Sequence, residues 1–533
     1  MDSVEEAIHD ARTVANISLH RSPFVPNEQD AAIITRKAQA LRVLQKETDA
    51  ELMRVFAKKQ SLDAQVAIHD ALTAPCRRLS PELLSEIFLL ALPERWKHEC
   101  AGKRSLGYAR VCRSWRDIAF KTPRLWSRLR FDANSNCLAR HTSAVQAELN
   151  KTGQVPLDLH MSMAISGPAY YPNPPPTVDD FWSDEAWALL HGQSHRWEKV
   201  WLEGIPLRAY DDLVGQVFPA LRNLAICIEE ADEEADEEAD EEADVTVLLN
   251  AFQSAPKLTS FYLNYKRPIR TLTLPQNWSL TKLDIYCGEC DEVMLMPCLS
   301  AILSCSDTLR ELCLGAEQQF ADFLVGLESV TFPRLEVLDL RHNAMPFCEF
   351  VTALPRLRDL RLSSSGDHDP FDTLQDIIDR LAGGKSLRTL ALRELDSTDA
   401  EDVLACLRRL PQLTELELQN YEDFGEEEAT PLITLDLIAA LTRDAANPAS
   451  LALLPNLTRL EMSFNGLEDA MTIDILQPSL SELLKSRRHA QVVDGMNLAV
   501  LEYFSTDGGQ DDVHWPPREG GSAVEDEDMD MDM

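Results

Sequence analysis

A short pattern of leucines recurs along the chain from about residue 195 onward. The unit reads L-x-x-L-x-L, is often introduced by proline, and occurs nine times, mostly at intervals of 22 to 30 residues. Alternating apolar and polar positions predict a short strand whose leucines point into a core. The leading leucines are Leu221, Leu258, Leu280, Leu309, Leu335, Leu357, Leu387, Leu413 and Leu457, and Trp197 leads an earlier copy, RWEKVWL.

Apolar stretches with helical spacing lie between these strands, for example Gln319–Val330, Leu374–Ala382 and Leu432–Thr442. One strand and one helix cannot close a core alone, so neighbouring units must stack and share one. The leucine-rich-repeat spacing L-x-x-L-x-L-x-x-N is complete in Leu335–Asn343 and, with methionine at the third leucine, in Leu457–Asn465. We therefore expect an α/β fold in which residues 195–507 form an irregular leucine-rich-repeat solenoid.

The segment 30–74 has the pattern of a long amphipathic helix, preceded by a flexible N-terminus, residues 1–29. Two interpretations remain open: a coiled-coil dimer, or a helix packed on its own chain. Thr48 and Glu51 interrupt the heptad seam, which favours the second. The residues that set the helical spacing are Leu41, Leu44, Val55, Leu62, Val66 and His69.

Three short amphipathic pieces follow within residues 77–131. In RRLSPELLSEIFLLALP, Ser80 suits a helix cap and Pro81 the first helical position. The second piece is SLGYARVCRSWRDIAF and the third is PRLWSRLRF. So small a module is marginal alone and tends to complete its core against a partner.

The series L-x-P-E-L-L-x-x-I-F, V-C-R-x-W-R-x-I-A and P-x-L-W resembles the F-box motif. This places an all-α F-box at residues 75–131. The order of helix, F-box and leucine-rich repeats resembles a class of F-box proteins abundant in fungi. The matching residues are Leu79, Pro81, Glu82, Leu83, Leu84, Ile87, Phe88, Val111, Cys112, Arg113, Trp115, Arg116, Ile118, Ala119, Pro123, Leu125 and Trp126.

The resemblance implies a non-catalytic adaptor. In this family the F-box binds the Skp-type linker of a cullin–RING ubiquitin ligase, and the repeats bind the protein to be ubiquitinated. Leu79, Pro81 and Phe88 are the first candidates for the linker-facing surface. The linker-binding residues implied by the motif are Leu79, Pro81, Glu82, Leu84, Ile87, Phe88, Val111, Cys112, Trp115, Leu125 and Trp126.

Individually, Leu83, Leu84, Val111 and Trp115 suit the module's own core better than partner contacts. The chain departs from the family pattern at Ser80, which replaces a proline, and in Pro93–Ser105, which lengthens the connection between the first two helices. A scaffold without ligase activity is the alternative function, and a helical cap on the solenoid is the alternative role of the module.

Positions two, four and six after each leading leucine should face outward and form a target-binding surface. Arg341, Arg361 and Arg393 fall on successive strands about 5 Å apart. They suggest a cationic strip for an acidic or phosphorylated segment. Solvated arginines balanced by Asp339 and Asp359 are the alternative, which we favour. The candidate target-binding residues are Tyr262, Tyr286, Arg341, Arg361 and Arg393.

Net charge is −37, and two acidic runs carry eighteen of the negative charges. The run at 229–244, four EEAD units, predicts a disordered insertion, and residues 508–533 predict an acidic disordered tail. The remaining body, at about −19, is still acidic, which argues against general nucleic-acid binding. Residues 132–194 read as a linker and solenoid N-cap region, with the extended loop Ser166–Thr177 inside it.

No secretory signal and no apolar run of membrane-spanning length is visible, and the twelve cysteines are scattered. We therefore expect reduced thiols, no membrane contact, and a location in the cytoplasm or nucleus.

Catalytic and metal motifs are weak. Cys287, Cys290, Cys298 and Cys305 partly resemble a zinc site but suit buried repeat cysteines better. Gly383–Ser386 lacks the leading glycine of a phosphate-binding loop, since Asp379 stands there. We predict no cofactor, no metal and no enzymatic activity.

Overall fold

The computed structural model describes residues 2–92, 107–132, 142–163, 182–228, 249–266, 272–288, 296–316, 329–363, 370–381, 386–393, 400–420, 432–464, 470–493, 495–507 and 514–515. The chain divides into two compact units, Met1–Leu90 and Ala91–Met533. The acidic insertion 229–244, the loop Ser166–Thr177, the connection Pro93–Ser105 and most of the tail 508–533 lie outside the described residues.

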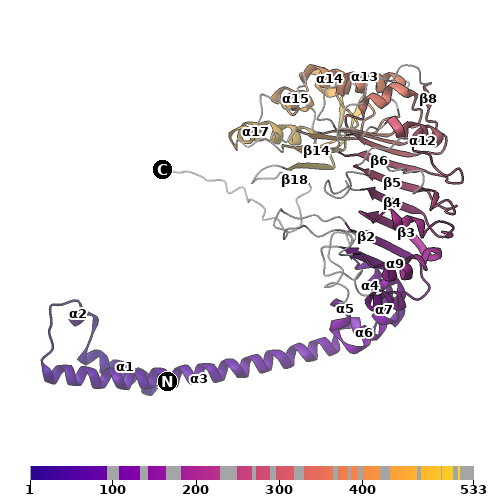
Figure 1. Ribbon diagram of the computed structural model, residues 1–533. Coiled ribbons are helices and arrows are strands. Elements are labelled where there is room, and N and C mark those ends of the chain that lie inside the picture. Colours follow the sequence, from indigo (N-terminus) through magenta and orange to yellow (C-terminus); the bar gives the residue numbers. More distant parts are fainter. Residues whose placement is uncertain are drawn as a thin grey trace, which may run out of the picture. The chain divides into compact units, whose positions relative to one another are not determined.

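The first unit is helical. Its longest element, α3 (Glu28–Thr73), begins where Asn27 Oδ1 accepts a hydrogen bond from Asp30 N at 2.8 Å. The segment expected to be flexible instead contains α1 (Asp2–Val14) and α2 (Ile17–His20), and α1 lies along the first turns of α3 through an Asp10–Lys37 ion pair (Figure 1). The other elements are η1 (Pro75–Arg78) and α4 (Pro81–Leu90).

The second unit is built on a 14-stranded sheet whose strands follow one another in sequence order (Figure 1). All neighbours are parallel except the last pair, which confirms the expected α/β class. The strands are β1 (Arg128–Asp132), β2 (Leu157–Ser162), β3 (Trp197–Glu203), β4 (Asn223–Ile228), β5 (Ser260–Tyr265), β6 (Lys282–Cys287), β7 (Glu311–Ala316), β9 (Val337–His342), β11 (Asp359–Ser363), β12 (Thr389–Arg393), β13 (Glu415–Gln419), β14 (Arg459–Ser463), β17 (Tyr503–Asp507) and β18 (His514–Trp515).

Each of the nine predicted repeat strands is present and begins two residues after its leading leucine. The nine leading leucines are fully buried, as is Trp197 at the start of β3. Burial alternates along the strands: in β5, Phe261 and Leu263 are buried while Ser260 and Tyr262 are half-buried. The alternation of apolar and polar residues that the leucine pattern predicts therefore determines which face of the sheet is covered by the core.

The sheet begins earlier in the chain than the sequence indicated, because strands β1 and β2 precede residue 195. At the other end, β17 lies within the expected range 195–507 but follows the last predicted copy of the unit, and β18 lies beyond that range. Leu501 is the leading leucine before β17, but buried Phe504 and Thr506 stand in place of the second and third leucines of the pattern. The L-x-x-L-x-L pattern misses such strands because other residues fill the same core positions.

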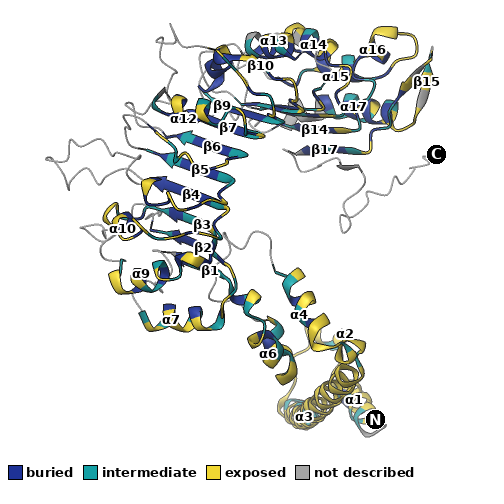
Figure 2. Cartoon of the chain, turned by 90° about the vertical axis from the view of Figure 1, so that its right-hand side faces the viewer, coloured by how far each residue is buried: buried dark blue, intermediate teal, exposed yellow. Residues whose placement is uncertain are grey.

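Helices connect the strands on one side of the sheet, where the core lies (Figures 1 and 2). The predicted helices Leu374–Ala382 and Leu432–Thr442 correspond to α13 and α15, whereas most of Gln319–Val330 lies outside the described residues. The connecting helices are α7 (Thr142–Lys151), α9 (Asp184–His191), η5 (Ser194–Arg196), α10 (Arg208–Asp211), η6 (Met296–Cys298), α12 (Leu299–Ser304), η7 (Met345–Phe350), α13 (Pro370–Arg380), α14 (Ala400–Arg408), α15 (Leu435–Leu441), α16 (Pro448–Ala452) and α17 (Ala470–Arg487).

The remaining elements are short. Three of them, α5 (Gly107–Val111), α6 (Arg113–Phe120) and η3 (Pro123–Trp126), precede the sheet. Two small ribbons pair β8 (Val330–Thr331) with β10 (Val351–Ala353) and β15 (Gln491–Val493) with β16 (Met496–Leu498). Within the described ranges, no helix combines the length and apolar composition that crossing a membrane requires.

Candidate interaction surfaces

Helix α4 carries the first part of the F-box-like series. Ser80 caps it as predicted: Leu83 N donates to Ser80 Oγ at 3.4 Å, and Leu84 N donates to Ser80 O at 3.0 Å. The pKa of Glu82 is lowered because its own backbone N–H and the Ser80 hydroxyl donate hydrogen bonds to its carboxylate. The first turn of α4 therefore presents a stabilised negative charge beside the exposed ring of Pro81.

The apolar residues of α4 divide between a covered and an uncovered face. Leu84 and Phe88 are buried, Phe88 to 1% exposure, whereas Leu83 is 56% and Leu90 85% exposed, with Ile87 also exposed. Phe88 therefore belongs to the interior, and Leu83 to the surface, the reverse of what the sequence indicated. The apolar stripe is wider than one helix face, so its spacing alone could not decide which edge is covered.

The second part of the series, α5 to η3, is held together by specific hydrogen bonds. Cys112 caps α6, since its Sγ accepts from Trp115 N at 3.5 Å. Arg116 Nε donates to Ala109 O at 2.9 Å and joins α6 to α5. Cys112 and Arg116 therefore have structural roles within this part of the chain.

Trp126 closes this part of the chain. Its Nε1 donates to Ala119 O at 3.0 Å, and its ring stacks on Phe120 with centroids 5.3 Å apart. Trp126 is buried, so it supports the module from within instead of facing a partner. Val111, expected in the core, is exposed, while Leu79, Cys112, Trp115 and Leu125 are half-buried.

The face of the sheet opposite the helices is called the open face here. It consists of the strand positions two, four and six after each leading leucine. In its N-terminal part the rings of Trp201 and Tyr262 stack at 5.1 Å, with His160 edge-on to Trp201 at 5.7 Å. Burial raises the pKa of the Tyr262 hydroxyl and, on the next strand, that of Asp284. This part of the open face is aromatic and partly shielded from water.

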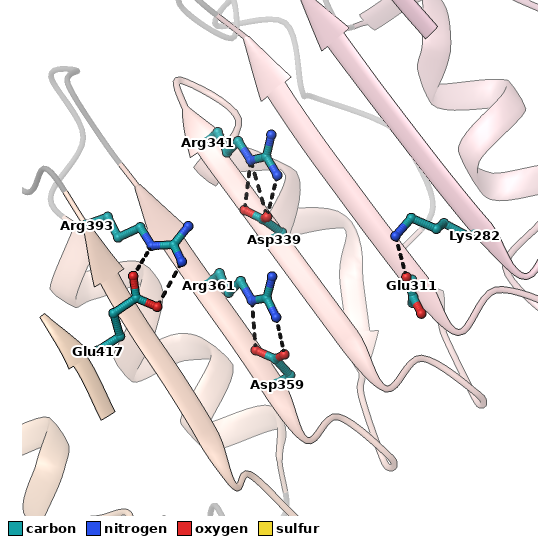
Figure 3. A network of polar contacts seen from close by, with 8 residues as sticks. All are labelled: Lys282, Glu311, Asp339, Arg341, Asp359, Arg361, Arg393 and Glu417. Atoms are coloured by element: carbon teal, nitrogen blue, oxygen red, sulfur yellow. Dashed lines mark hydrogen bonds and ion pairs between the residues drawn. The ribbon is translucent and has the colours of Figure 1, made fainter. Parts of the chain in front are cut away.

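The arginines of the open face are paired with carboxylates (Figure 3). Arg341 Nη2 lies 2.7 Å from Asp339 Oδ2, and Arg361 Nη2 lies 2.7 Å from Asp359 Oδ2. The third pair joins Nε of Arg393 to Oε1 of Glu417 at 2.6 Å on adjacent strands.

The pairing agrees with the favoured alternative of balanced arginines and not with a cationic strip. Arg341 and Arg393 are both in register with Ser363, whereas Arg361 is in register with Asp339 and Ala391, so the three arginines do not form one row. Their charges are balanced as in the favoured alternative, with Glu417 as an additional partner. Lys282 and Arg459, the other cations at open-face positions from β6 to β14, pair with Glu311 and Glu461. No surplus positive charge remains there for a phosphorylated segment.

Cys287 and Cys298 are buried in the core beside the sheet, as predicted, whereas Cys305 is half-buried. Cys287 Sγ donates to Tyr265 OH at 2.7 Å, and Cys298 Sγ lies 3.4 Å from the same oxygen. Burial raises the pKa of the Cys298 thiol to about 12. Cys290 lies outside the described residues, and those that are described contain no group of three metal-ligating side chains.

Comparison with models of known protein families gives no match for this chain. A search of curated protein sequences likewise finds no relative.

Proposed function

We propose that this protein is a substrate-recruiting adaptor of a cullin–RING ubiquitin ligase. The segment Leu79–Trp126 docks on a Skp-type linker, and the sheet-bearing unit presents a target protein. The observation that carries the proposal is the uncovered apolar face of α4, formed by Leu83, Ile87 and Leu90. This face lies directly after the Ser80 cap of α4, within the segment whose residues resemble the F-box series.

Single exposed apolar residues are common on protein surfaces and need no partner. Here three of them share one short helix, and Val111 and Phe120 are also exposed in the second part of the series. Cys112 and Trp126, by contrast, serve for capping and internal packing. Supporting residues inside and apolar residues outside are what a small docking module requires.

The sheet-bearing unit is proposed to be a leucine-rich-repeat solenoid. Nine sequence copies give nine parallel strands in sequence order, and their leading leucines occupy equivalent buried positions. The target is proposed to bind on the open face, with Tyr262, which stacks on Trp201, and Tyr286 as candidate contacts. Aromatic side chains offer large contact areas at low entropic cost, which suits a recognition surface.

Linker capture by the full-length chain tests the docking proposal. The purified chain is incubated with a Skp-type linker and a cullin, and both are measured in the bound fraction. The double substitution Leu83→Glu with Ile87→Glu should lower linker capture at least tenfold. Leu207→Glu with Val214→Glu, two exposed apolar positions in the second unit, is the matched control and should leave capture unchanged.

Circular dichroism of both variants should match the parent chain, so that lost capture reports docking and not unfolding. Undiminished capture by the Leu83 and Ile87 variant would refute docking through α4. If the parent chain captures neither linker nor cullin, the scaffold function without ligase activity replaces the proposal.

A further inference from the structure

Helix α3 continues far beyond the part that α1 covers. Over its first turns the half-buried residues Ile34, Ala38, Leu41 and Leu44 mark the face toward α1. None of the residues of α3 is buried (Figure 2). The interpretation of a helix packed on its own chain therefore holds in this unit only where α1 is present.

The face that α1 covers continues uncovered toward the C-terminal end of α3. Leu52, Val55, Leu62 and Val66 carry it on, each 54% to 66% exposed. Long helices without tertiary packing are only marginally stable, because propensity alone contributes little. A row of large apolar side chains along such a helix indicates a missing partner.

The row has the spacing of a coiled coil. Gln45, Leu52, Lys59 and Val66 fall seven residues apart, and Thr48, Val55, Leu62 and His69 form a second series offset by three. The two series span three and a half heptads, about 37 Å of helix. In this register Thr48 is a polar position within the seam, whereas Glu51 lies beside the seam and does not interrupt it. Lys59 is the one charged residue among the eight seam positions, and it pairs with Asp63 of its own helix at 2.8 Å. A single lysine at such a position fixes the register of the partner at some cost in stability.

Charge complementarity identifies the partner and its direction. If a second copy of α3 lies parallel and in register, Lys58 of each copy faces Asp63 of the other, and Lys59 faces Lys59 within the seam. If the same stretch is paired antiparallel, Lys58 faces Lys58 and each Asp49 faces an Asp63, so all of these contacts join like charges. The parallel direction, with two contacts between opposite charges and one between like charges, therefore fits a second copy of this chain better.

We infer that the protein forms a homodimer through a parallel two-stranded coiled coil of α3, residues 45–69. The inference goes beyond the proposed function and does not depend on linker binding. The dimer holds two docking modules and two open faces in one particle, which raises the effective concentration for a second contact after a first one forms.

Light scattering coupled to size-exclusion chromatography of the full-length chain tests the dimer. The parent chain at micromolar concentration should have twice the chain mass of 59.9 kDa. Leu52→Glu with Leu62→Glu places charges in the seam and should halve the measured mass. Met53→Glu with Ile68→Glu changes two comparably exposed apolar residues of the same helix that lie outside the seam, and should leave the dimer intact.

A monomeric parent chain at 100 µM, or equal loss of mass in the seam and control variants, would overturn the inference. A dimer that survives the seam substitutions would place the contact elsewhere in the chain and overturn it as well. The parallel direction of the two α3 helices is tested with Lys58→Glu, which should raise the dissociation constant of the dimer several-fold at low salt. An unchanged constant would refute the parallel arrangement.

Discussion

The ring of Tyr286 on β6 lies against the backbone of Gly315 on β7, so that a Cβ added at Gly315 would stand 2.5 Å from Tyr286 Cδ2. Gly315 is thus the residue that lets an aromatic side chain lie flat on the open face. Gly315→Ala should displace the ring and lower the free energy of unfolding by about 1–3 kcal/mol, measured by urea denaturation. Gly107→Ala, where nothing lies within 4 Å of the added atom, is the control and should not destabilise the chain. Equal stability of the Gly315 variant and the parent would show that the ring moves freely.

The Arg341–Asp339 and Arg361–Asp359 pairs should differ in their effect on stability. Asp339 is buried, whereas Asp359 and Glu417 retain contact with water. Arg341→Met leaves a buried carboxylate without its guanidinium, and should cost about 3 kcal/mol. Arg361→Met should cost under about 1 kcal/mol, because its partner is partly solvated. Thermal and urea unfolding of both variants measure the difference, and equal losses would contradict the ranking.

Asp284 should make stability depend on pH. Burial raises its pKa above the usual 3.8, although Arg341 and Lys282 act in the opposite direction. A carboxyl with a raised folded-state pKa favours the folded state most at low pH, and this contribution is lost as pH rises through that pKa. Asp284→Asn should therefore gain stability relative to the parent between pH 4 and pH 7. A difference in unfolding free energy that is the same at both pH values would contradict this assignment.

The repeat strands could be predicted because their leucines fill equivalent positions in one continuous core. Leu258 and Leu335, for example, are fully buried two residues before β5 and β9. Strand β17 escaped prediction because Phe504 occupies a leucine position. Helix α1 was not predicted because it is stabilised by packing along α3, which periodicity does not report, and α2 was not predicted because it is a single turn capped by Asn16 Oδ1.

The candidate sites were harder to predict than the fold. The stripe of α4 contains both Phe88 and Leu83, and only the packed structure decides that the first is buried and the second exposed. The open-face arginines were placed on the correct strands, but their pairing depends on rotamers and on acids such as Glu417 one strand away. Side-chain pairing of this kind follows from three-dimensional neighbours and leaves no signal in residue spacing.

The pairing between β4 and β5 shows how little the connecting segments constrain the sheet. Asn223 is in register with Ser260, and Ser260 is in register with Lys282, although the first connection contains the EEAD units and the second is much shorter. Closing a longer loop costs only a little more entropy, so connector length and strand register can change independently. The connectors are therefore the places where this architecture can gain new segments during evolution, and where a reporter domain could be inserted without disturbing the strands on either side.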